Sequence, residues 1–116
     1  MSSLKVLAQV TTFNSAKVID ATIEALCRQT YPIAEILLID NASADGTLDR
    51  VFPGKVTIIR NRQNLGISGA IAAAMEYALG RGYDWIYILD ADSEPEPGAI
   101  ANLVRCYLNL SPDLQA

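Results

Sequence analysis

The chain has 116 residues, of which 51% are hydrophobic and 19% are charged, and its formal net charge is −4. This length fits one domain with a real core, and the composition excludes an intrinsically disordered chain. The nine basic residues form no basic run, so we expect no nucleic acid partner. The absence of histidine removes a side chain that zinc sites and Ser-His-Asp catalytic groups commonly use.

Apolar runs and amphipathic segments alternate along the chain. Short apolar runs predict buried strands, and apolar residues spaced three or four apart predict helices that cover a sheet. The predicted elements, in chain order, are strand 6–10, helix 16–29, strand 35–40, a short helix 47–52, strand 55–60, helix 68–79, strand 85–89 and helix 99–110. This alternation predicts one α/β domain over residues 1–116, with a mainly parallel sheet between two helical layers.

Local signals set some of the expected boundaries and faces. Asn14 and Ser15 are candidate N-caps for helix 16–29, and Gly80 is the expected stop of helix 68–79. Cys27 and Cys106 form no Cys-x-x-Cys motif, and we expect both to pack as small apolar residues on helices, in a reducing compartment. The last helix is expected to present one apolar side made of Leu103, Val104, Tyr107 and Leu108.

Two carboxylates, Asp90 and Asp92, directly follow the apolar run 85–89. Open α/β sheets bind ligands at the carboxyl ends of their strands, so the position favours a site. Two neighbouring acids repel each other, and a divalent cation removes this repulsion. A cation is also what a diphosphate ligand needs. The pair therefore predicts a metal–nucleotide site, although a plain solvated turn before the Pro95–Gly98 bend remains an alternative.

The same edge of the predicted sheet carries two further polar segments. Asp40 ends the second predicted strand, and the turn from Thr11 to Asn14 follows the first. Because parallel strands end at one edge, we expect a single cleft to collect Asp40, Asp92 and this turn. The competing interpretation of Asp40 is an ordinary turn acid.

Four motifs together resemble the family 2 glycosyltransferases of GT-A fold, in particular the rhamnosyltransferase-like members that build surface polysaccharides. They occur in the family's order and at about its spacing, and they span nearly the whole chain. The motifs are Val10–Asn14, Ile39–Thr47, Asn64–Ala70 and Leu89–Ser93. The resemblance implies a donor nucleotide-binding half of a GT-A domain.

The resemblance also implies roles for particular residues on the nucleotide side. Thr11 and Asn14 would contact the base and ribose, and the loop with Asn64 and Gly66 would border them. Asp40 would accept the imide N–H of the base, which favours a UDP- or dTDP-sugar.

On the diphosphate side, the resemblance implies an Asp-x-Asp site for Mg²⁺ or Mn²⁺. Asp92 would be a metal ligand, and Asp90 would support the metal or the ribose. The family's acceptor would be a saccharide or a lipid-linked saccharide, and its cellular place the cytoplasm or the inner membrane face, where nucleotide-sugars are found.

The chain departs from the family after Asp92, where only a short, mostly helical segment follows. The acceptor half and its catalytic base would be missing, so the catalytic residue is unknown and the chain is expected to be a fragment or a half-domain that needs a partner. An edge strand and apolar helix surface would then be exposed, which favours a homo-oligomer. The alternatives are a non-catalytic nucleotide-sugar-binding module and a haloacid-dehalogenase-type phosphatase, whose motif normally opens the first strand.

Overall fold

The computed structural model describes residues 4–110 and 112–115 and contains four strands that all run in parallel. The sheet order is β3-β2-β1-β4. The elements are β1 (Val6–Thr12), α1 (Ile19–Cys27), β2 (Glu35–Asn41), β3 (Val56–Asn61), α2 (Gly66–Arg81), β4 (Trp85–Asp90), α3 (Ala99–Leu108) and a 3-10 turn (Pro112–Leu114).

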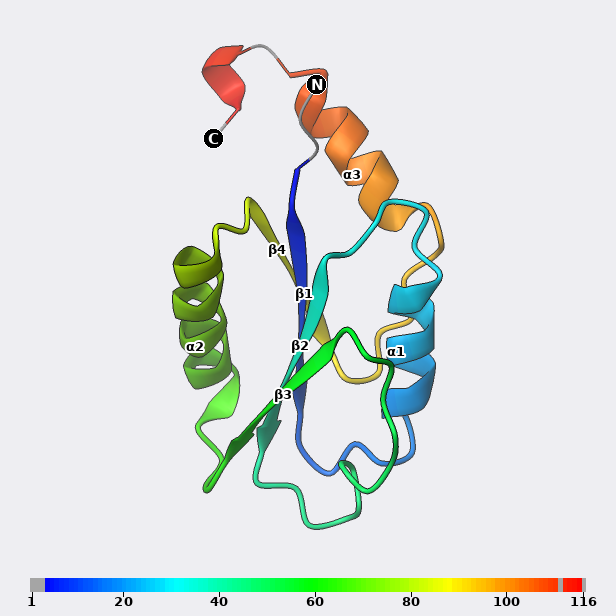
Figure 1. Cartoon of the computed structure of the whole chain (residues 1–116), viewed down its shortest axis with the longest axis vertical. Helices are drawn as coiled ribbons and strands as arrows, with labels where there is room; N and C mark the ends of the chain where they lie inside the picture. Colours follow the sequence, from blue (N-terminus) through cyan, green and yellow to red (C-terminus); the bar gives the residue numbers. More distant parts are fainter. Residues whose placement is uncertain (1–3, 111, 116) are drawn as a thin grey trace.

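Helices cover both faces of the sheet, with α2 on one side and α1 and α3 on the other (Figure 1). Side chains alternate along β1, so Leu7 packs against α2 while Ala8 and Val10 face α1 and α3. The same alternation along β2 places Leu37 and Ile39 in a core under α2, and Ile36 and Leu38 in a separate core on the opposite face of the sheet. The predicted three-layer α/β/α fold with a parallel sheet is confirmed.

The helix α2 meets the sheet through small side chains. Its fully covered residues are Ala70, Ala74 and Ala78, one every fourth position, so a narrow stripe of methyl groups faces Leu7 and Leu37. The helix continues through Gly80 and ends at Gly82, which has φ +70°. The predicted stop at Gly80 is therefore wrong, because the left-handed residue that closes the last turn is the next glycine.

The strand β4 lies at an edge of the sheet, not in its buried centre as its apolar sequence predicted. Within the described chain it pairs with β1 alone. Leu89 is its one buried residue, and Ile88 is 46% exposed. An apolar run can therefore mark an edge whose outer side another segment or chain could cover.

Three local predictions fail for identifiable reasons. Residues 47–50 form turns and bends, and residues 51–52 have no regular structure, instead of the short helix that was predicted. The side chain of Asp45 holds the backbone and hydroxyl of Thr47 in a turn. The helix α1 begins at Ile19, with no side-chain cap from Asn14 or Ser15. Cys27 and Cys106 do lie on helices, but both are exposed, since they face away from the sheet.

The last helix packs through a side that overlaps only partly with the one expected, since Val104 is buried and Tyr107 packs against the sheet residue Trp85. Its buried residues are Ile100 and Val104, whereas Leu103 and Leu108 are about half exposed. Tyr107 contacts Trp85 edge-on, with ring centroids 5.1 Å apart. No helix among residues 4–110 and 112–115 has the length and hydropathy needed to cross a membrane.

Candidate functional site

A cleft of about 440 Å³ opens at the carboxyl edge of the sheet. Six of the seven residues predicted to bind nucleotide or metal line it: Thr11, Asn14, Asn64, Gly66, Asp90 and Asp92. The remaining lining residues are Phe13, Ser15, Val18, Asn41, Ile67 and Ala91. Segments 11–18, 64–67 and 90–92, which are far apart in the sequence, therefore meet in one site.

Asp40 is the exception, because it does not line the cleft. Its side chain is fully buried and lies on the α1 face of β2, in step with Ile36 and Leu38. Strand alternation carries the next residue, Asn41, to the cleft instead. The expectation that one cleft collects the Asp40 carboxylate with Asp92 is therefore wrong.

The carboxylate of Asp40 fastens the turn that follows β1. Its Oδ1 accepts hydrogen bonds from Thr12 Oγ1 and Ser43 Oγ, both at 2.6 Å, and its Oδ2 accepts one from Ser43 N at 3.0 Å. Ser43 Oγ in turn accepts a hydrogen bond from Asn14 N at 2.8 Å. Asp40 thus shapes the cleft wall without facing the ligand space.

Asn41 is a polar cleft residue that the sequence analysis did not identify. It is 2% exposed, and its Nδ2 donates to the carbonyl of Gly66 at 3.2 Å. Its Oδ1 accepts from Asn61 Nδ2 at 2.9 Å and from Leu65 N at 3.4 Å. The side chain therefore holds the loop between β3 and α2 at the floor of the cleft. Side chains two apart in a strand share a face, so the position two residues after the buried Ile39 was the sequence signal for Asn41.

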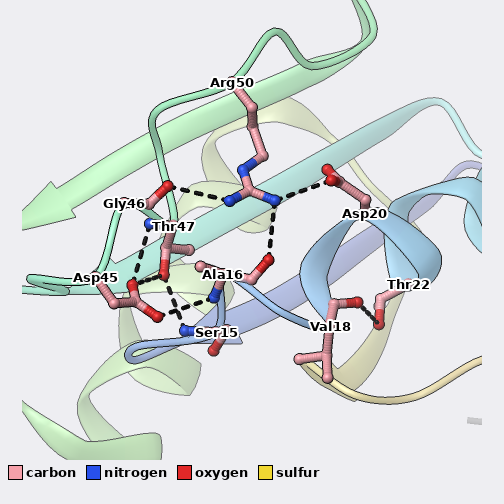
Figure 2. A network of polar contacts seen from close by, with 9 residues as sticks. All are labelled: Ser15, Ala16, Val18, Asp20, Thr22, Asp45, Gly46, Thr47 and Arg50. Carbon is pink, nitrogen blue, oxygen red and sulfur yellow. Dashed lines mark hydrogen bonds and ion pairs between the residues drawn. The ribbon is translucent and has the colours of Figure 1, made fainter.

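The wall formed by residues 13–16 is supported by the loop that follows β2 (Figure 2). Ser15 N donates to Thr47 Oγ1 at 2.8 Å, and Ala16 N donates to Asp45 Oδ2 at 3.0 Å. The hydrogen bond from the Thr47 hydroxyl, with smaller ones from the Ala16 and Thr47 amides, holds the pKa of Asp45 below its usual 3.8 against the opposing effect of desolvation. Asp45 is therefore an anionic acceptor at neutral pH.

Arg50 ties the two loops to α1, and Figure 2 shows its guanidinium between three acceptors. Nη1 donates to the carbonyl of Ala16 at 3.0 Å and to Asp20 Oδ2 at 2.9 Å. Nη2 donates to the carbonyl of Gly46 at 3.1 Å. The motif from Asp45 to Arg50 thus supports the cleft wall from behind.

Gln9 lies beneath Thr11 on the same face of β1 and is fully buried. Its Nε2 donates to Thr11 Oγ1 at 2.9 Å. Because that hydroxyl oxygen already accepts this bond, its own proton is free to point into the cleft. The Thr11 hydroxyl can therefore donate a hydrogen bond to a ligand while it accepts the one from Gln9.

Ala42 has a left-handed backbone, with φ +60°. A Cβ is unfavourable there, so we expect Ala42→Gly to raise the free energy of unfolding by about 1 kcal/mol. Ala44, two residues away, has no positive φ, so Ala44→Gly should lower it by roughly 0.5–1 kcal/mol. Urea denaturation of both variants measures the difference, and equal losses would contradict this loop conformation.

Asp90 and Asp92 are both exposed and flank Ala91 in a turn, where Ser93 N donates to the carbonyl of Asp90 at 3.1 Å. Among the residues described, no group of three or more acidic, cysteine or histidine side chains could hold a metal. Mg²⁺ commonly takes one or two carboxylates and completes its shell with phosphates and water. Two oxygen ligands beside an open cleft fit a metal that is shared with a diphosphate.

The parallel sheet, its two helical layers and the cleft with two carboxylates at its carboxyl edge agree with the GT-A nucleotide-binding half that the motifs led us to expect. A sequence model described as Glycosyl transferase family 2 matches residues 8–113. The chain therefore belongs to the family 2 glycosyltransferases. This membership also decides against the phosphatase alternative.

Curated relatives are longer proteins of the same kind. The chain is 29% identical over 107 residues to an undecaprenyl-phosphate mannosyltransferase of Micrococcus luteus, covering 88% of this chain and 44% of that protein. It is 33% identical over 99 residues to the Escherichia coli β-1,3-glucosyltransferase WfaP, which acts on α-D-GlcNAc-diphosphoundecaprenol. This match covers 83% of this chain and 38% of WfaP. The chain thus spans less than half the length of these relatives.

Solved structures give the same picture of the fold. The mannosyltransferase PcManGT from Pyrobaculum calidifontis, solved with GDP-Man and Mn²⁺, is similar with a TM-score of 0.78 and 27% identity, over 90% of this chain and 32% of that one. S. aureus TarS 1-349 with UDP has a TM-score of 0.67 and 21% identity, over 91% of this chain and 32% of that one. At this identity the likeness supports the fold alone.

Proposed function

We propose that this chain binds the nucleoside diphosphate part of a nucleotide-sugar donor, together with Mg²⁺ or Mn²⁺, for transfer of the sugar to an acceptor. The observation that carries the proposal is the meeting of Thr11, Asn64, Asp90 and Asp92 in one cleft within a family 2 glycosyltransferase chain. The complex of PcManGT with GDP-Man and Mn²⁺ supports both the ligand class and the metal.

Each cleft residue has a defined part in this proposal. Asp92 and Asp90 supply carboxylate oxygens to the metal, and a bound metal neutralises the negative charge that develops on a leaving diphosphate. Thr11 donates its free hydroxyl proton to the nucleoside. Asn14 Oδ1 accepts a hydrogen bond from the amide of Ala44, and its Nδ2 offers two protons to a ligand. Gly66 borders the ligand through its backbone.

The identity of the base depends on Asn41 in this structure. A pyrimidine donor, UDP or dTDP, was expected because a carboxylate at Asp40 would accept the imide N–H, but that group faces away. Asn41 has one amide proton left after its bond to Gly66 and suits a carbonyl on the base. Uracil, thymine and guanine all present one, whereas adenine presents an amino group.

The acceptor and the catalytic base complete the proposal. The acidic residues that line the cleft are Asp90 and Asp92, and both are assigned to the metal. We therefore propose that a base outside this cleft activates a saccharide or lipid-linked acceptor in polysaccharide synthesis, at the cytoplasmic side of the membrane. The chain by itself would then act as a donor-binding module.

Titration calorimetry tests the donor site directly. We expect UDP, dTDP and GDP to bind within about tenfold of one another, ADP to bind more weakly, and Mn²⁺ to tighten all four compared with EDTA. Binding of ADP as tightly as UDP would contradict the role of Asn41. No binding of any nucleotide, with or without Mn²⁺, would overturn the proposed function.

A further inference from the structure

The segment that carries Asp90 and Asp92 is fastened to α1 by a buried hydroxyl. Thr22, in the middle of α1, is fully buried, and its Oγ1 donates to the carbonyl of Ala91. Ala91 is the residue between the two aspartates. The other acceptor near Thr22 is the carbonyl of Val18, 3.5 Å away (Figure 2), so Ala91 is the closer partner.

The far end of the same segment is fastened to residues that directly follow α1. Gln29 Nε2 donates to the carbonyl of Glu96 at 2.7 Å, and Gln29 Oε1 accepts from Ile100 N at 3.2 Å. Thr30 N donates to the carbonyl of Pro97 at 2.8 Å. The turn from Ala91 to Pro97 is therefore held at two separate places, by Thr22 on α1 and by Gln29 and Thr30 just after it.

The hydrogen bond from Thr22 matters for the carboxylates because β4 ends at Asp90, before the turn that carries Asp92. The strand lies at the edge of the sheet, and Asp90 and Asp92 are exposed. A hydrogen bond to the carbonyl of Ala91 fixes the peptide plane that leads into Asp92. A turn that is fixed in advance loses less conformational entropy when both carboxylates bind one cation.

We infer that Thr22 is a positioning residue for the metal-binding pair Asp90 and Asp92. The inference rests on the proposed function, since it concerns the same metal. Thr22 does not touch the ligand space and acts only through the backbone of Ala91. Its removal should therefore weaken the metal-dependent part of nucleotide binding and leave the metal-free part intact.

Three variants separate this role from a purely structural one. Thr22→Val keeps the shape of the side chain and loses the hydroxyl, while Thr22→Ser keeps the hydroxyl. Gln29→Ala loosens the same segment beyond the carboxylates, and Gln29 does not line the cleft. It serves as the matched control for a loss of stability without a loss of metal alignment.

The dissociation constant of UDP is measured in EDTA and in saturating Mn²⁺, and the ratio of the two values is the metal enhancement. We expect Thr22→Val to reduce this ratio about tenfold, as for other residues that orient metal ligands. The dissociation constant of Thr22→Val in EDTA should stay within about twofold of the wild-type value. The metal enhancement of Thr22→Ser and of Gln29→Ala should also stay within about twofold of the wild-type enhancement. Thermal melting of all variants shows whether they are folded.

An independent readout uses no metal. Ser93 N closes the turn onto Asp90, so its amide should exchange faster in Thr22→Val than in Thr22→Ser. If Thr22→Val does not fold, Thr22→Ala replaces it in both measurements. Unchanged enhancement and unchanged Ser93 exchange in the hydroxyl-free variant would overturn the inference. A wild type without any metal enhancement would instead overturn the proposed function, whatever the exchange data show.

Discussion

Asp92→Asn should remove the Mn²⁺-dependent part of nucleotide binding. An amide keeps the shape of the side chain but loses the anionic oxygen that a hard divalent cation prefers. We expect the dissociation constant of UDP in Mn²⁺ to rise at least about tenfold, which corresponds to roughly 1.4 kcal/mol, and to approach its value in EDTA. Asp90→Asn should act in the same direction, because both carboxylates line the cleft.

A nearby acid supplies the control for this prediction. Glu94 is exposed and lies on the same segment but does not line the cleft. Glu94→Gln makes the same change of charge and should leave the Mn²⁺ enhancement unaltered. If Glu94→Gln weakens binding as much as Asp92→Asn, then the general acidity of the segment attracts the cation, and no defined metal site is present.

Glu35→Gln should be the most destabilising of the polar substitutions considered. Glu35 opens β2, and its carboxylate accepts hydroxyl hydrogen bonds from Thr57, Tyr77 and Tyr83. An amide replaces one acceptor oxygen by a donor, so at least one of these hydroxyls loses its partner. We expect the free energy of unfolding to fall by about 2 kcal/mol. Urea denaturation measures it, with Glu76→Gln on the exposed side of α2 as the control.

The same cluster predicts how stability depends on pH. Burial raises the pKa of Glu35, but the hydrogen bonds from Thr57, Tyr77 and Tyr83, with the nearby charge of Arg81, outweigh it, and the pKa falls below 4.5. The stabilisation is therefore complete above pH 4.5 and is lost as the pH falls through the folded-state pKa. The gap in stability between the wild type and Glu35→Gln should narrow in acid. A gap that widens would contradict this sign.

Tyr83 sets the upper end of the pH range over which the cluster stabilises the fold. Burial, followed by the hydrogen bond to Glu35 and the negative charge of that group, raises the pKa of Tyr83 to about 12. Its contribution is therefore complete below pH 10 and is lost as the pH rises through about 12. Between these limits the cluster joins the start of β2, the start of β3 and the end of α2.

The architecture was predictable from sequence because it depends on local periodicity. The apolar runs of β1 and β2 and the alternation of strands with helices specify a parallel sheet and the edge where ligands bind. The edge argument correctly placed Thr11, Asn14 and Asp92 in one cleft, whereas Asn64 was expected only from the family resemblance. The edge position of β4 was not predictable, since strand order is a property of the whole fold and not of one apolar run.

The errors within the site have a common physical origin. Asp40 and Asn41 are adjacent, and one residue of strand register decides which of them faces the cleft. The partners of Asp45 and Thr47 lie about 30 positions away, at Ala16 and Ser15, and such long-range contacts leave no local pattern. Cys27 was expected to be buried but is exposed, because the sequence alone did not specify which side of the helix packs against the sheet.

The loops around the cleft are bonded to one another as well as to the strands they follow. Ser43 and Asp45 hold residues 14–16, and Asn41 holds the loop before α2. A change of length in one loop is therefore transmitted to the others. The preference for a donor in such a domain would therefore depend on several loops together. Exchange of a single loop between relatives would disturb the whole cleft.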